Sequence, residues 1–463
     1  MSQSFSELPL SPAMLDNLNA LDYHHMTPVQ AQALPLILAG RDVVAQAKTG
    51  SGKTAAFGIG LLHKLDVSNF QVQALVLCPT RELADQVAKE VRRLGRFTHN
   101  IKVLILCGGM PLGPQIGSLE HGAHVVVGTP GRLMEHLRKQ TLSLANLQTL
   151  VLDEADRMLD MGFSDAIAAI VKECPAQRQT LLFSATYPEQ IDTMTSRYLQ
   201  QPQRVQVESV HHHEVIAQHF YPIDARAQGY QLIERLLATH TPESTVIFCA
   251  TKQECQELAD QLADDGYYAL AIHGDMQQRE RDQVLLRFSN RSCSLLIATD
   301  VAARGLDFKA LDLVINYELP RDPEVYIHRM GRTGRAGEQG LTISLVTERD
   351  MHRLERIEQL IRQPPEWHHE NELAMVDQKG LKPPMITIAI DGGKKNKIRP
   401  GDILGALTGD AGFAADLIGK IDIFPFHSYV AVQRQHGKAI LARLRESTIK
   451  GRKLKVRLLD RLK

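Results

Sequence analysis

The sequence predicts an α/β protein with two domains built on buried parallel sheets, followed by a small α+β domain. Its 463 residues are too many for one hydrophobic core. Short apolar runs without polar alternation, such as DVVAQA, ALVLCP and TLVLDEA, alternate with helix-like stretches. This alternation is typical of parallel sheets that are covered by helices on both faces. The last segment has a different order of elements and an excess of positive charge.

The positions of these runs predict the domain boundaries. The first series fills residues 1–208 and indicates a doubly wound α/β domain. After a polar linker at 209–214, the runs TVIFCAT, YALAIHG, SLLIATD and DLVINYE indicate a second α/β domain at 215–362. A linker rich in Pro, His and Glu is expected at 363–384. The remainder, 385–463, has the order β-α-β-β-α-β.

Charge is distributed unevenly along a chain whose net charge is zero. Residues 385–463 hold 16 lysines and arginines against 7 acidic residues, so the rest of the chain is acidic by the same margin. A basic module on an acidic body indicates a polyanionic partner, most simply nucleic acid. The N-terminal MSQSFSELPLSPAM lacks the features of a signal peptide, and no apolar run reaches the roughly 18 residues of a membrane span. We therefore expect a cytoplasmic protein without a membrane partner.

Neither the cysteines nor the clustered histidines predict a metal site. The six cysteines have no C-x-x-C spacing, and several stand in strand-like runs, so buried free thiols are expected. The consecutive histidines 211–213 lack a second ligand pair nearby and indicate a solvated linker.

The stretch AKTGSGKT at 47–54 predicts a phosphate-binding loop, because it follows a strand-like run and precedes a helix-like one. Ala47 stands where the general pattern has its first glycine. Backbone amides and the helix N-terminus would hold phosphates, with Lys53 on the β- and γ-phosphates and Thr54 offering its hydroxyl to Mg²⁺. The expected ATP contacts in this loop are Lys48, Thr49, Gly50, Ser51, Gly52, Lys53 and Thr54.

The stretch VLDEAD at 151–156 predicts the metal side of the same site. Asp153 follows a buried strand and could hold Mg²⁺, directly or through water. Glu154 could orient or deprotonate the attacking water. Alone, the four residues DEAD could equally be a solvated acidic loop. Their place after VL, about 100 residues beyond the phosphate loop, favours the metal site.

The stretch HRMGRTGRAG at 328–337 sets two arginines three residues apart between glycines. Phosphoryl transfer needs positive charge at the γ-phosphate, and guanidinium groups supply it. Arg332 and Arg335 lie about 280 residues beyond Lys53, in the second predicted domain. If they act catalytically, ATP binds between the domains and closure completes the site. The alternative is an arginine-rich surface turn.

In their order, these motifs resemble those of the DEAD-box RNA helicases of superfamily 2 over about residues 5–362. The resemblance implies two RecA-like domains that hydrolyse ATP with Mg²⁺ and separate short RNA duplexes. TPVQ at 27–30 resembles the Q motif, which implies that Gln30 reads the adenine edge and Tyr23 stacks near it, although Asp22 and Met26 replace the usual Gly and Pro.

Further roles follow from the same resemblance. SAT at 184–186 implies that Ser184 and Thr186 contact the acidic motif, including Asp156, and couple ATP closure to strand separation. His328 is implied to bridge toward the DEAD loop. Gly305 and Asp307, in ATDVAARGLD, are implied to face the nucleotide.

The resemblance also implies contacts to the RNA backbone from loops at strand ends. Small residues, hydroxyls and arginines suit phosphates and 2′-hydroxyls rather than base edges, so the core should be blind to sequence. The implied RNA residues of the core are Pro79, Thr80, Arg81, Gly108, Gly109, Thr129, Pro130, Gly131, Arg132, Gln278, Arg281, Thr299 and Asp300.

Residues 385–463 resemble the C-terminal RNA-binding domain of DbpA-type bacterial DEAD-box proteins, notably in IDGGKKNKIRPGDILGAL. This implies an RRM-like fold, binding to 23S ribosomal RNA and work on large-subunit precursors (pre-50S particles). Helices are expected at about 400–408 and 436–446. In FHSYVAV only His427 and Tyr429 stand near the positions where an RRM shows exposed aromatics. Binding is expected instead from Lys394, Lys395, Lys397, Arg452, Lys453 and Lys455.

The sequence therefore predicts an RNA-dependent ATPase that remodels ribosomal RNA. An ATP-gated RNA clamp or scaffold, in which unwinding is incidental, would use the same motifs and stays open. A DNA helicase is disfavoured by the RNA-type motifs and by the tail. The basic tail could also be a general tether.

Overall fold

The computed structural model describes residues 3–47, 50–187, 189–207, 216–303, 311–334, 340–376, 380, 382–410 and 412–459. The chain divides into two compact units, 1–210 and 211–463. The division falls in the predicted linker at 209–214, which lies outside the described residues. Among the described helices, none combines the length and apolar character needed to cross a membrane.

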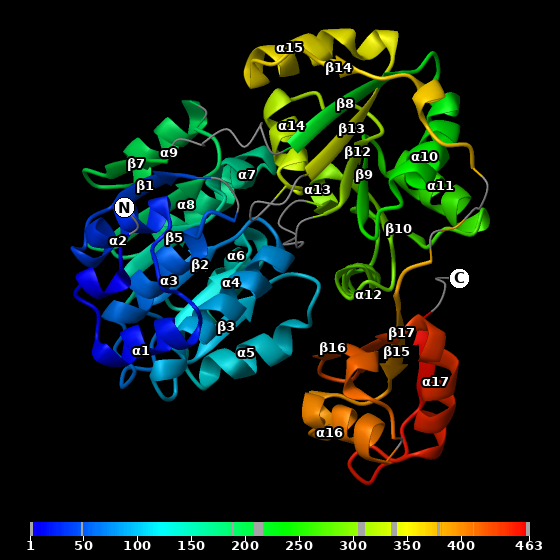
Figure 1. Ribbon diagram of the computed structural model, residues 1–463. Helices are drawn as coiled ribbons and strands as arrows, with labels where there is room; N and C mark the ends of the chain where they lie inside the picture. The colour runs from blue at the N-terminus through cyan, green and yellow to red at the C-terminus, as the bar shows by residue number, and fades with distance from the viewer. Residues whose placement is uncertain are drawn as a thin grey trace. The chain divides into compact units, whose positions relative to one another are not determined.

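The first unit is a parallel sheet covered by helices on both faces (Figure 1). Its strands are β1 (Val43–Gln46), β2 (Ala74–Leu77), β3 (Val103–Leu106), β4 (Val125–Gly128), β5 (Thr149–Leu152), β6 (Gln179–Ser184) and β7 (Gln203–Gln206), in the order β3-β4-β2-β5-β6-β1-β7. Its helices are α1 (Pro12–Ala20), α2 (Pro28–Leu38), α3 (Lys53–Lys64), α4 (Arg81–Leu94), α5 (Leu112–Glu120), α6 (Pro130–Arg138), α7 (Ala155–Asp160), α8 (Ser164–Lys172) and α9 (Glu189–Tyr198).

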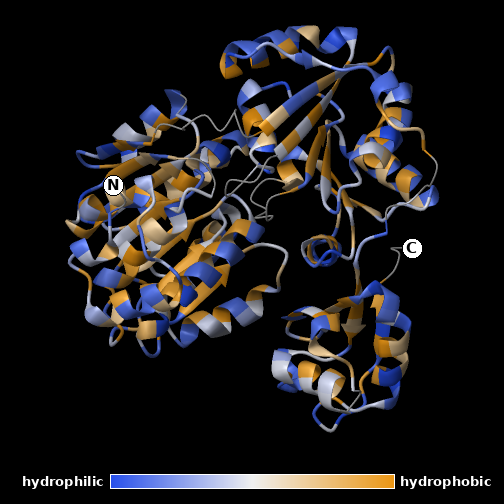
Figure 2. Cartoon of the chain, viewed as in Figure 1, coloured by the Kyte–Doolittle hydropathy of each residue, from blue (hydrophilic) through white to orange (hydrophobic). Residues whose placement is uncertain are grey.

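Two cores lie on the two faces of this sheet, as the unbroken apolar runs predict. In β1, Val43 and Ala45 belong to one core while Val44, between them, belongs to the other. Successive side chains of a strand point to opposite faces, so both faces need apolar residues. Figure 2 shows the strands of this unit as predominantly hydrophobic.

The part of the second unit that precedes the tail domain repeats this architecture. Its strands are β8 (Ile216–Pro222), β9 (Thr245–Cys249), β10 (Ala269–Ile272), β11 (Leu295–Thr299), β12 (Leu313–Asn316), β13 (Gly340–Val346) and β14 (Glu366–Trp367), in the parallel order β10-β11-β9-β12-β13-β8-β14. Its helices are α10 (Arg226–His240), α11 (Lys252–Asp264), α12 (Gln278–Ser289), α13 (Asp300–Ala303), α14 (Pro323–Met330) and α15 (Met351–Ile361). The predicted pair of RecA-like parallel sheets is confirmed.

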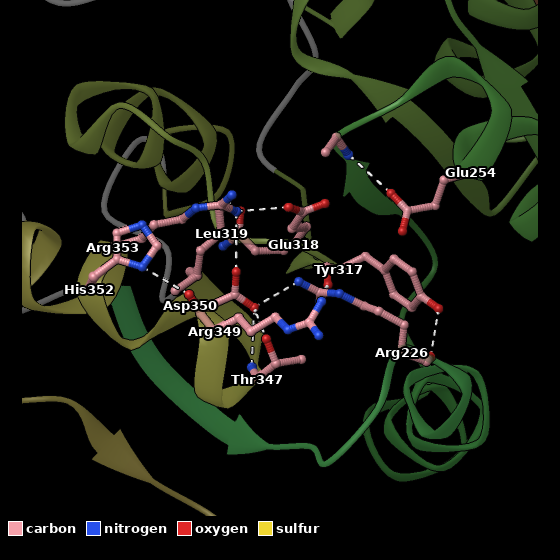
Figure 3. A network of polar contacts seen from close by, with 12 residues as sticks. Arg226, Glu254, Tyr317, Glu318, Leu319, Thr347, Arg349, Asp350, His352 and Arg353 are labelled. Carbon is pink, nitrogen blue, oxygen red and sulfur yellow. Dashed lines mark hydrogen bonds and ion pairs between the residues drawn. The ribbon is translucent and has the colours of Figure 1, made fainter.

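A buried carboxylate ties the end of β13 to its neighbours (Figure 3). Asp350 is 3% exposed and accepts hydrogen bonds from the Thr347 hydroxyl at 2.6 Å and from Arg226 at 2.8 Å. Arg353 bonds to the other oxygen at 3.2 Å and pairs with Glu318 at 2.7 Å. Because every buried charge here has a partner, the network fixes where α15 begins.

The segment 363–384, predicted as a linker, differs in part from that prediction. Residues 366–367 form β14, which pairs with β8 at the sheet edge. Trp367 lies beside Phe220 with ring centroids 6.1 Å apart, and Leu373 is buried in the core of the unit. Trp367 and Leu373 are two apolar residues in an otherwise polar stretch, and they pack this segment against the sheet. The many Pro, His and Glu residues around them are typical of a linker, which is why the sequence predicted one.

The last part of the chain has the predicted β-α-β-β-α-β order. Its elements are β15 (Met385–Ile390), α16 (Pro400–Gly405), β16 (Ile418–Ile423), β17 (Ser428–Gln433), α17 (Gly437–Glu446) and β18 (Val456–Leu459). The antiparallel sheet has the order β16-β17-β15-β18, so the first and third strands are central, as in an RRM-like domain.

All six cysteines are free thiols, as expected, and five of them are buried. Burial raises the pKa of the Cys78 and Cys249 thiols well above the usual value. These thiols therefore behave as small apolar side chains rather than as nucleophiles.

Candidate nucleotide and RNA sites

The phosphate loop joins the end of β1 to the start of α3. Gly50 and Gly52 have φ values of +83° and +94°, a conformation that favours glycine. The Lys53 ammonium is turned onto the loop, where it donates to the Ala47 carbonyl at 2.7 Å, and its side chain is buried. Ser51 and Thr54 are half-buried beside it, and Lys48 and Thr49 lie outside the described residues. The loop thus carries one buried cation at the N-terminus of a helix, as phosphate binding requires.

The Q-motif glutamine is packed directly on this loop. The Gln30 Nε2 donates to the Gly52 carbonyl at 3.1 Å, and its Oε1 accepts from the Thr27 amide at 2.9 Å. A Cβ on Gly52 would lie 2.5 Å from the Gln30 Nε2, so glycine is needed there for space as well as for conformation. The start of α2 is therefore packed against the phosphate loop and hydrogen-bonded to it.

Tyr23, expected near the adenine, is anchored to α4. Its phenol donates to Glu90 at 2.8 Å and accepts from Arg93 at 3.1 Å. Burial, together with the Glu90 carboxylate, raises the pKa of Tyr23 to about 12, so the phenol stays protonated. Its ring also meets Phe5 edge-on, with centroids 6.1 Å apart.

The acidic motif follows β5 and is almost wholly buried. Asp153 is 3% exposed; burial raises the pKa of its carboxyl to about 7, against the opposing effect of the Lys53 charge. A divalent cation would favour the charged carboxylate there, and oxygen ligands are those that Mg²⁺ prefers. The buried carboxyl of Asp153 and the hydroxyl of Thr54 therefore fit the predicted metal.

Glu154 occupies a strained position. Its φ of +50° lies in the left-handed region, which costs a non-glycine residue roughly 1–3 kcal/mol. Its carboxylate is buried and paired with the Arg157 guanidinium three residues on. Strain of this kind persists only where the surroundings enforce it, so the fold fixes the direction of this carboxylate.

The acidic motif is hydrogen-bonded to the SAT segment. Asp156 Oδ2 accepts from the Thr186 hydroxyl and the Thr186 amide, both at 2.9 Å, and from the Ala185 amide at 3.2 Å. The expected contact of Thr186 with the acidic motif is present. Ser184 differs from expectation: its hydroxyl is buried without a hydrogen-bond partner among the described residues, and its carbonyl accepts from the Ala47 amide at 2.9 Å. It ends β6 beside the phosphate loop instead.

Replacing Thr186 with valine should weaken the link between the acidic motif and the SAT segment. Valine keeps the shape but removes the hydroxyl, so one of the three bonds from the SAT segment to Asp156 is lost, worth about 1.5–3 kcal/mol for a charged acceptor. We expect duplex unwinding to fall about tenfold or more while RNA-stimulated ATP hydrolysis changes less than threefold, measured in parallel assays. Thr193→Val, on the exposed face of α9, is the matched control. A parallel loss of both activities would contradict the coupling role.

Three candidate RNA motifs meet at one end of the first sheet. The strands that precede them, β3, β4 and β2, are neighbours, and the Arg132 guanidinium from one motif donates to the Met110 carbonyl beside another at 3.0 Å. Gly108 and Gly131 are exposed, with open space where a Cβ would stand. Arg81, at the start of α4, is half-buried. These loops leave backbone accessible to a ligand.

Some side chains of these motifs are structural. Pro79 and Pro130 are buried, and Thr80 caps α4 by accepting from the Leu83 amide at 3.3 Å. Thr129 is half-buried before α6, while Gly109 is exposed with a φ of +73°. In this unit, the groups open to RNA are therefore mainly backbone and arginine.

Strand order separates the two candidate sites of the first unit. The ends of β5, β6 and β1 carry the acidic motif, the SAT segment and the phosphate loop, and the ends of β3, β4 and β2 carry the RNA motifs. β2 and β5 are paired, so PTRELA lies next to DEAD. Ligands of open α/β sheets bind at the carboxyl ends of the strands, and here that edge is divided into two adjacent halves.

In the second unit, Asp300 has a structural partner instead of a free carboxylate. Both of its oxygens bond to Arg329, at 2.7 and 2.8 Å. Arg329 is 3% exposed and also donates to Asn316 at 2.9 Å. Asp300 therefore holds Arg329, and with it α14, while its own side chain stays 24% exposed; that it faces RNA stays a prediction. A carboxylate beside phosphates would repel them, whereas here it compensates a buried cation.

The other predicted residues of this unit are placed as follows. Thr299 is the last residue of β11 and is 7% exposed. Gln278 is the first residue of α12 and donates to Asp282 at 2.9 Å, and Arg281 follows one turn later on the same helix. His328 is half-buried on α14, and Arg332 is 7% exposed just after that helix. Gly305, Asp307 and Arg335 lie outside the described residues.

The tail brings its two predicted basic stretches together. Lys394, Lys395 and Lys397 are exposed on one turn, and Lys450 donates to the Lys397 carbonyl at 2.7 Å. The neighbouring run contributes exposed Arg452, Lys453 and Lys455, the last accepting from the Asp391 amide at 2.9 Å. We call these seven residues, Lys394, Lys395, Lys397, Lys450, Arg452, Lys453 and Lys455, the tail basic patch.

One residue of this region was missed by the sequence analysis. Phe426 is 58% exposed, and the Lys395 ammonium lies 4.4 Å from its ring centroid. An exposed aromatic beside lysines is a platform on which an RNA base can stack. The signal was present in the sequence as FPFH, an aromatic next to proline just before a strand.

The sheet face of the tail is not free. Tyr429 is 6% exposed and packs with Leu286 of α12 and with Leu459, and its phenol accepts from Gln283 at 3.3 Å. The Thr387 hydroxyl accepts from Asn290 at 2.9 Å. The position nearest to an RRM aromatic therefore packs against the second RecA-like domain.

Comparisons with known proteins agree with this architecture. Residues 27–194 match the DEAD/DEAH box helicase family, 228–337 the helicase conserved C-terminal domain and 387–458 the DbpA RNA binding domain. The structure resembles Saccharomyces cerevisiae Dbp5 bound to RNA and ADP BeF3, with a TM-score of 0.74 and 32% identity over 80% of this chain and 97% of that one. Two RecA-like domains with these motifs define a DEAD-box ATP-dependent RNA helicase.

The relatives narrow the class. The chain is 54% identical to the ATP-dependent RNA helicase DbpA of Escherichia coli (strain K12) over 450 residues, which are 97% of this chain and 98% of that protein. It is 42% identical to the ATP-dependent RNA helicase CshA of Listeria monocytogenes, over 78% of this chain and 71% of that protein. The chain belongs to the DEAD-box ATP-dependent RNA helicases of the DbpA type.

Proposed function

We propose that this helicase hydrolyses ATP in response to 23S ribosomal RNA and opens short duplexes in cytoplasmic precursors of the large ribosomal subunit. The observation that supports this most is the pairing of a hydrogen-bonded ATPase motif set with a tail that carries the tail basic patch and an exposed aromatic ring beside one of its lysines. The first supplies a response to ATP, and the second supplies affinity for a polyanion.

Each residue of the ATP site has a proposed role. Lys53 neutralises the β- and γ-phosphates. Asp153 and Thr54 would hold Mg²⁺, which would supply further positive charge to offset that of the phosphates. Glu154 orients the attacking water and receives its proton. Arg332 and Arg335 supply positive charge to the γ-phosphate during its transfer.

The tail is proposed to deliver the core to its RNA. The tail basic patch binds phosphates, and Phe426 stacks on an unpaired base. Because the sheet face carrying Tyr429 is covered, we place RNA on the turns that carry the patch. The core then contacts the nearby backbone through its glycine-rich loops without reading sequence.

The proposal is tested by ATP hydrolysis at fixed ionic strength with three nucleic acids: fragments of 23S ribosomal RNA, unrelated RNA of equal length, and DNA of matching sequence. We expect stimulation at least tenfold stronger by a 23S fragment than by either of the others. Equal rates with all three would contradict the ribosomal target. Strong RNA binding without duplex release would instead indicate the clamp function.

Neutralising the lysine turn should weaken RNA binding in a salt-dependent manner. In the variant with Lys394, Lys395 and Lys397 all changed to alanine, we expect the magnitude of the slope of log affinity against log salt to decrease by up to about 2–3, since each lost phosphate contact removes about 0.7–0.9. Lys438→Ala, exposed on α17, is the matched control. An unchanged slope, measured by fluorescence titration, would place RNA elsewhere on the tail.

A further inference from the structure

A second cluster of possible ligands lies in the second unit, apart from every motif discussed above. His219 on β8, Glu366 on β14 and His368 just beyond it each offer one ligand atom, and these atoms all lie within 4.8 Å of one another. Among the residues that the structure describes, no other cluster of three His, Cys, Asp or Glu meets this criterion.

The backbone brings the three side chains together. β14 pairs in parallel with β8, and this register sets Glu366 opposite His219. The His368 amide continues the pairing by donating to the Phe220 carbonyl at 2.9 Å. The two imidazole rings consequently lie with their centroids 4.0 Å apart. Since β-pairing fixes these positions, the cluster is preformed and does not depend on a chance meeting of long side chains.

A neighbouring carboxylate orients one of the ligands. The Nδ1 of His368 contacts Glu372 at 2.8 Å, which leaves its Nε2 directed at Glu366, 3.2 Å away. The Nε2 of His219 lies 4.0 Å from the same Glu366 oxygen. A histidine that contacts a carboxylate through one nitrogen and points the other at the ligand site is the arrangement usually found at protein metal sites, and here that second nitrogen hydrogen-bonds to Glu366.

We propose that His219, His368 and Glu366 bind a zinc ion that fastens the segment after α15 to the edge of the second sheet. Donors at about 2.0–2.1 Å from tetrahedral zinc lie about 3.4 Å apart, so the observed 3.2 and 4.0 Å need shifts below about 1 Å. Two imidazoles favour zinc over Mg²⁺ or Ca²⁺.

Exposure fits a site that is structural and open to solution. The two imidazoles are each 21% exposed, while the Glu366 side chain is 64% exposed. The ion can therefore enter from solvent, and water completes its coordination. The metal would reinforce a segment that Trp367 and Leu373 already dock, and binding to the folded chain alone raises stability by mass action.

The test uses the full-length chain with histidines 211–213 changed to serine in every sample, so that they cannot bind metal. Zinc affinity is measured by competition with a chromogenic chelator. We expect one equivalent bound by the parent, and at least tenfold weaker binding by His368→Gln and by Glu366→Gln. Glu372→Gln, which loosens the orientation of His368, should weaken binding about 10–100-fold. The matched control is His369→Gln, one residue along and exposed, which should bind as the parent does.

Two further measurements keep the result decisive. Zinc should slow amide hydrogen exchange of residues 366–374 in the parent and not in His368→Gln. If that variant is not folded by circular dichroism, His219→Gln replaces it. Absence of binding by the parent, equal loss in the His369→Gln control, or full binding by both Glu366→Gln and His368→Gln would overturn the proposal.

Discussion

Replacing Glu154 with glutamine should lower the RNA-stimulated kcat for ATP hydrolysis by about 10²–10⁴-fold, the range for loss of a general acid or base. Glutamine keeps the size of the side chain but cannot accept the proton of the attacking water. Nucleotide affinity should change less than threefold, because the phosphate loop, Lys53 and Gln30 are untouched. The measurement is steady-state hydrolysis at saturating RNA, with binding of a fluorescent ATP analogue alongside.

The ion pair with Arg157 requires a check on folding, because the change leaves that guanidinium without its buried partner. Circular dichroism at the assay temperature shows whether the first unit is intact. Glu120→Gln, exposed at the end of α5, is the matched control and should retain full activity. A folded Glu154→Gln protein with a kcat near that of the parent would remove Glu154 from its proposed role.

Replacing Arg329 with methionine should destabilise the second unit by about 3–5 kcal/mol, the usual cost of breaking a buried ion pair. The change leaves the Asp300 carboxylate and the Asn316 side chain without their shared donor. Denaturant unfolding followed by circular dichroism measures the loss. Arg321→Met, in the exposed loop before α14, should change the free energy of unfolding by less than about 0.5 kcal/mol.

The same experiment separates two roles for Asp300. If Asp300 serves mainly to hold Arg329, Asp300→Asn should lower stability, and adding it to Arg329→Met should cost little more. RNA affinity of the folded protein should then stay within threefold. A large change in RNA affinity without loss of stability would support the predicted RNA contact of Asp300.

The fold was predictable because the apolar strand runs and the helix-like stretches between them recur many times along the chain. Runs such as TLVLDEA have apolar residues on both faces of a strand, and only a helix-covered parallel sheet buries both. Membership of the DEAD-box helicases was likewise carried by ordered motifs, and the family matches confirm it. The enzyme class and the DbpA type of the chain are confirmed in the same way.

Other features depend on packing that a sequence pattern does not record. Motif resemblance marks Asp300 and Ser184 as important without saying what each touches. One holds a buried arginine, and the other ends a strand beside the phosphate loop. β14 has two residues, fewer than any periodicity can reveal. Phe426 is a single aromatic residue, and its exposure depends on the conformation of the surrounding turn, which no sequence pattern gives.

The docking of β14 also determines where a truncated protein that lacks the tail domain should end. A fragment ending near residue 362 would uncover part of the outer backbone of β8 and the ring of Phe220, which β14 and Trp367 now shield. Bare strand edges recruit strands from other molecules. Such a truncated core would tend to self-associate. A fragment that extends past Leu373 would keep β14 paired with β8 and so keep that sheet edge covered.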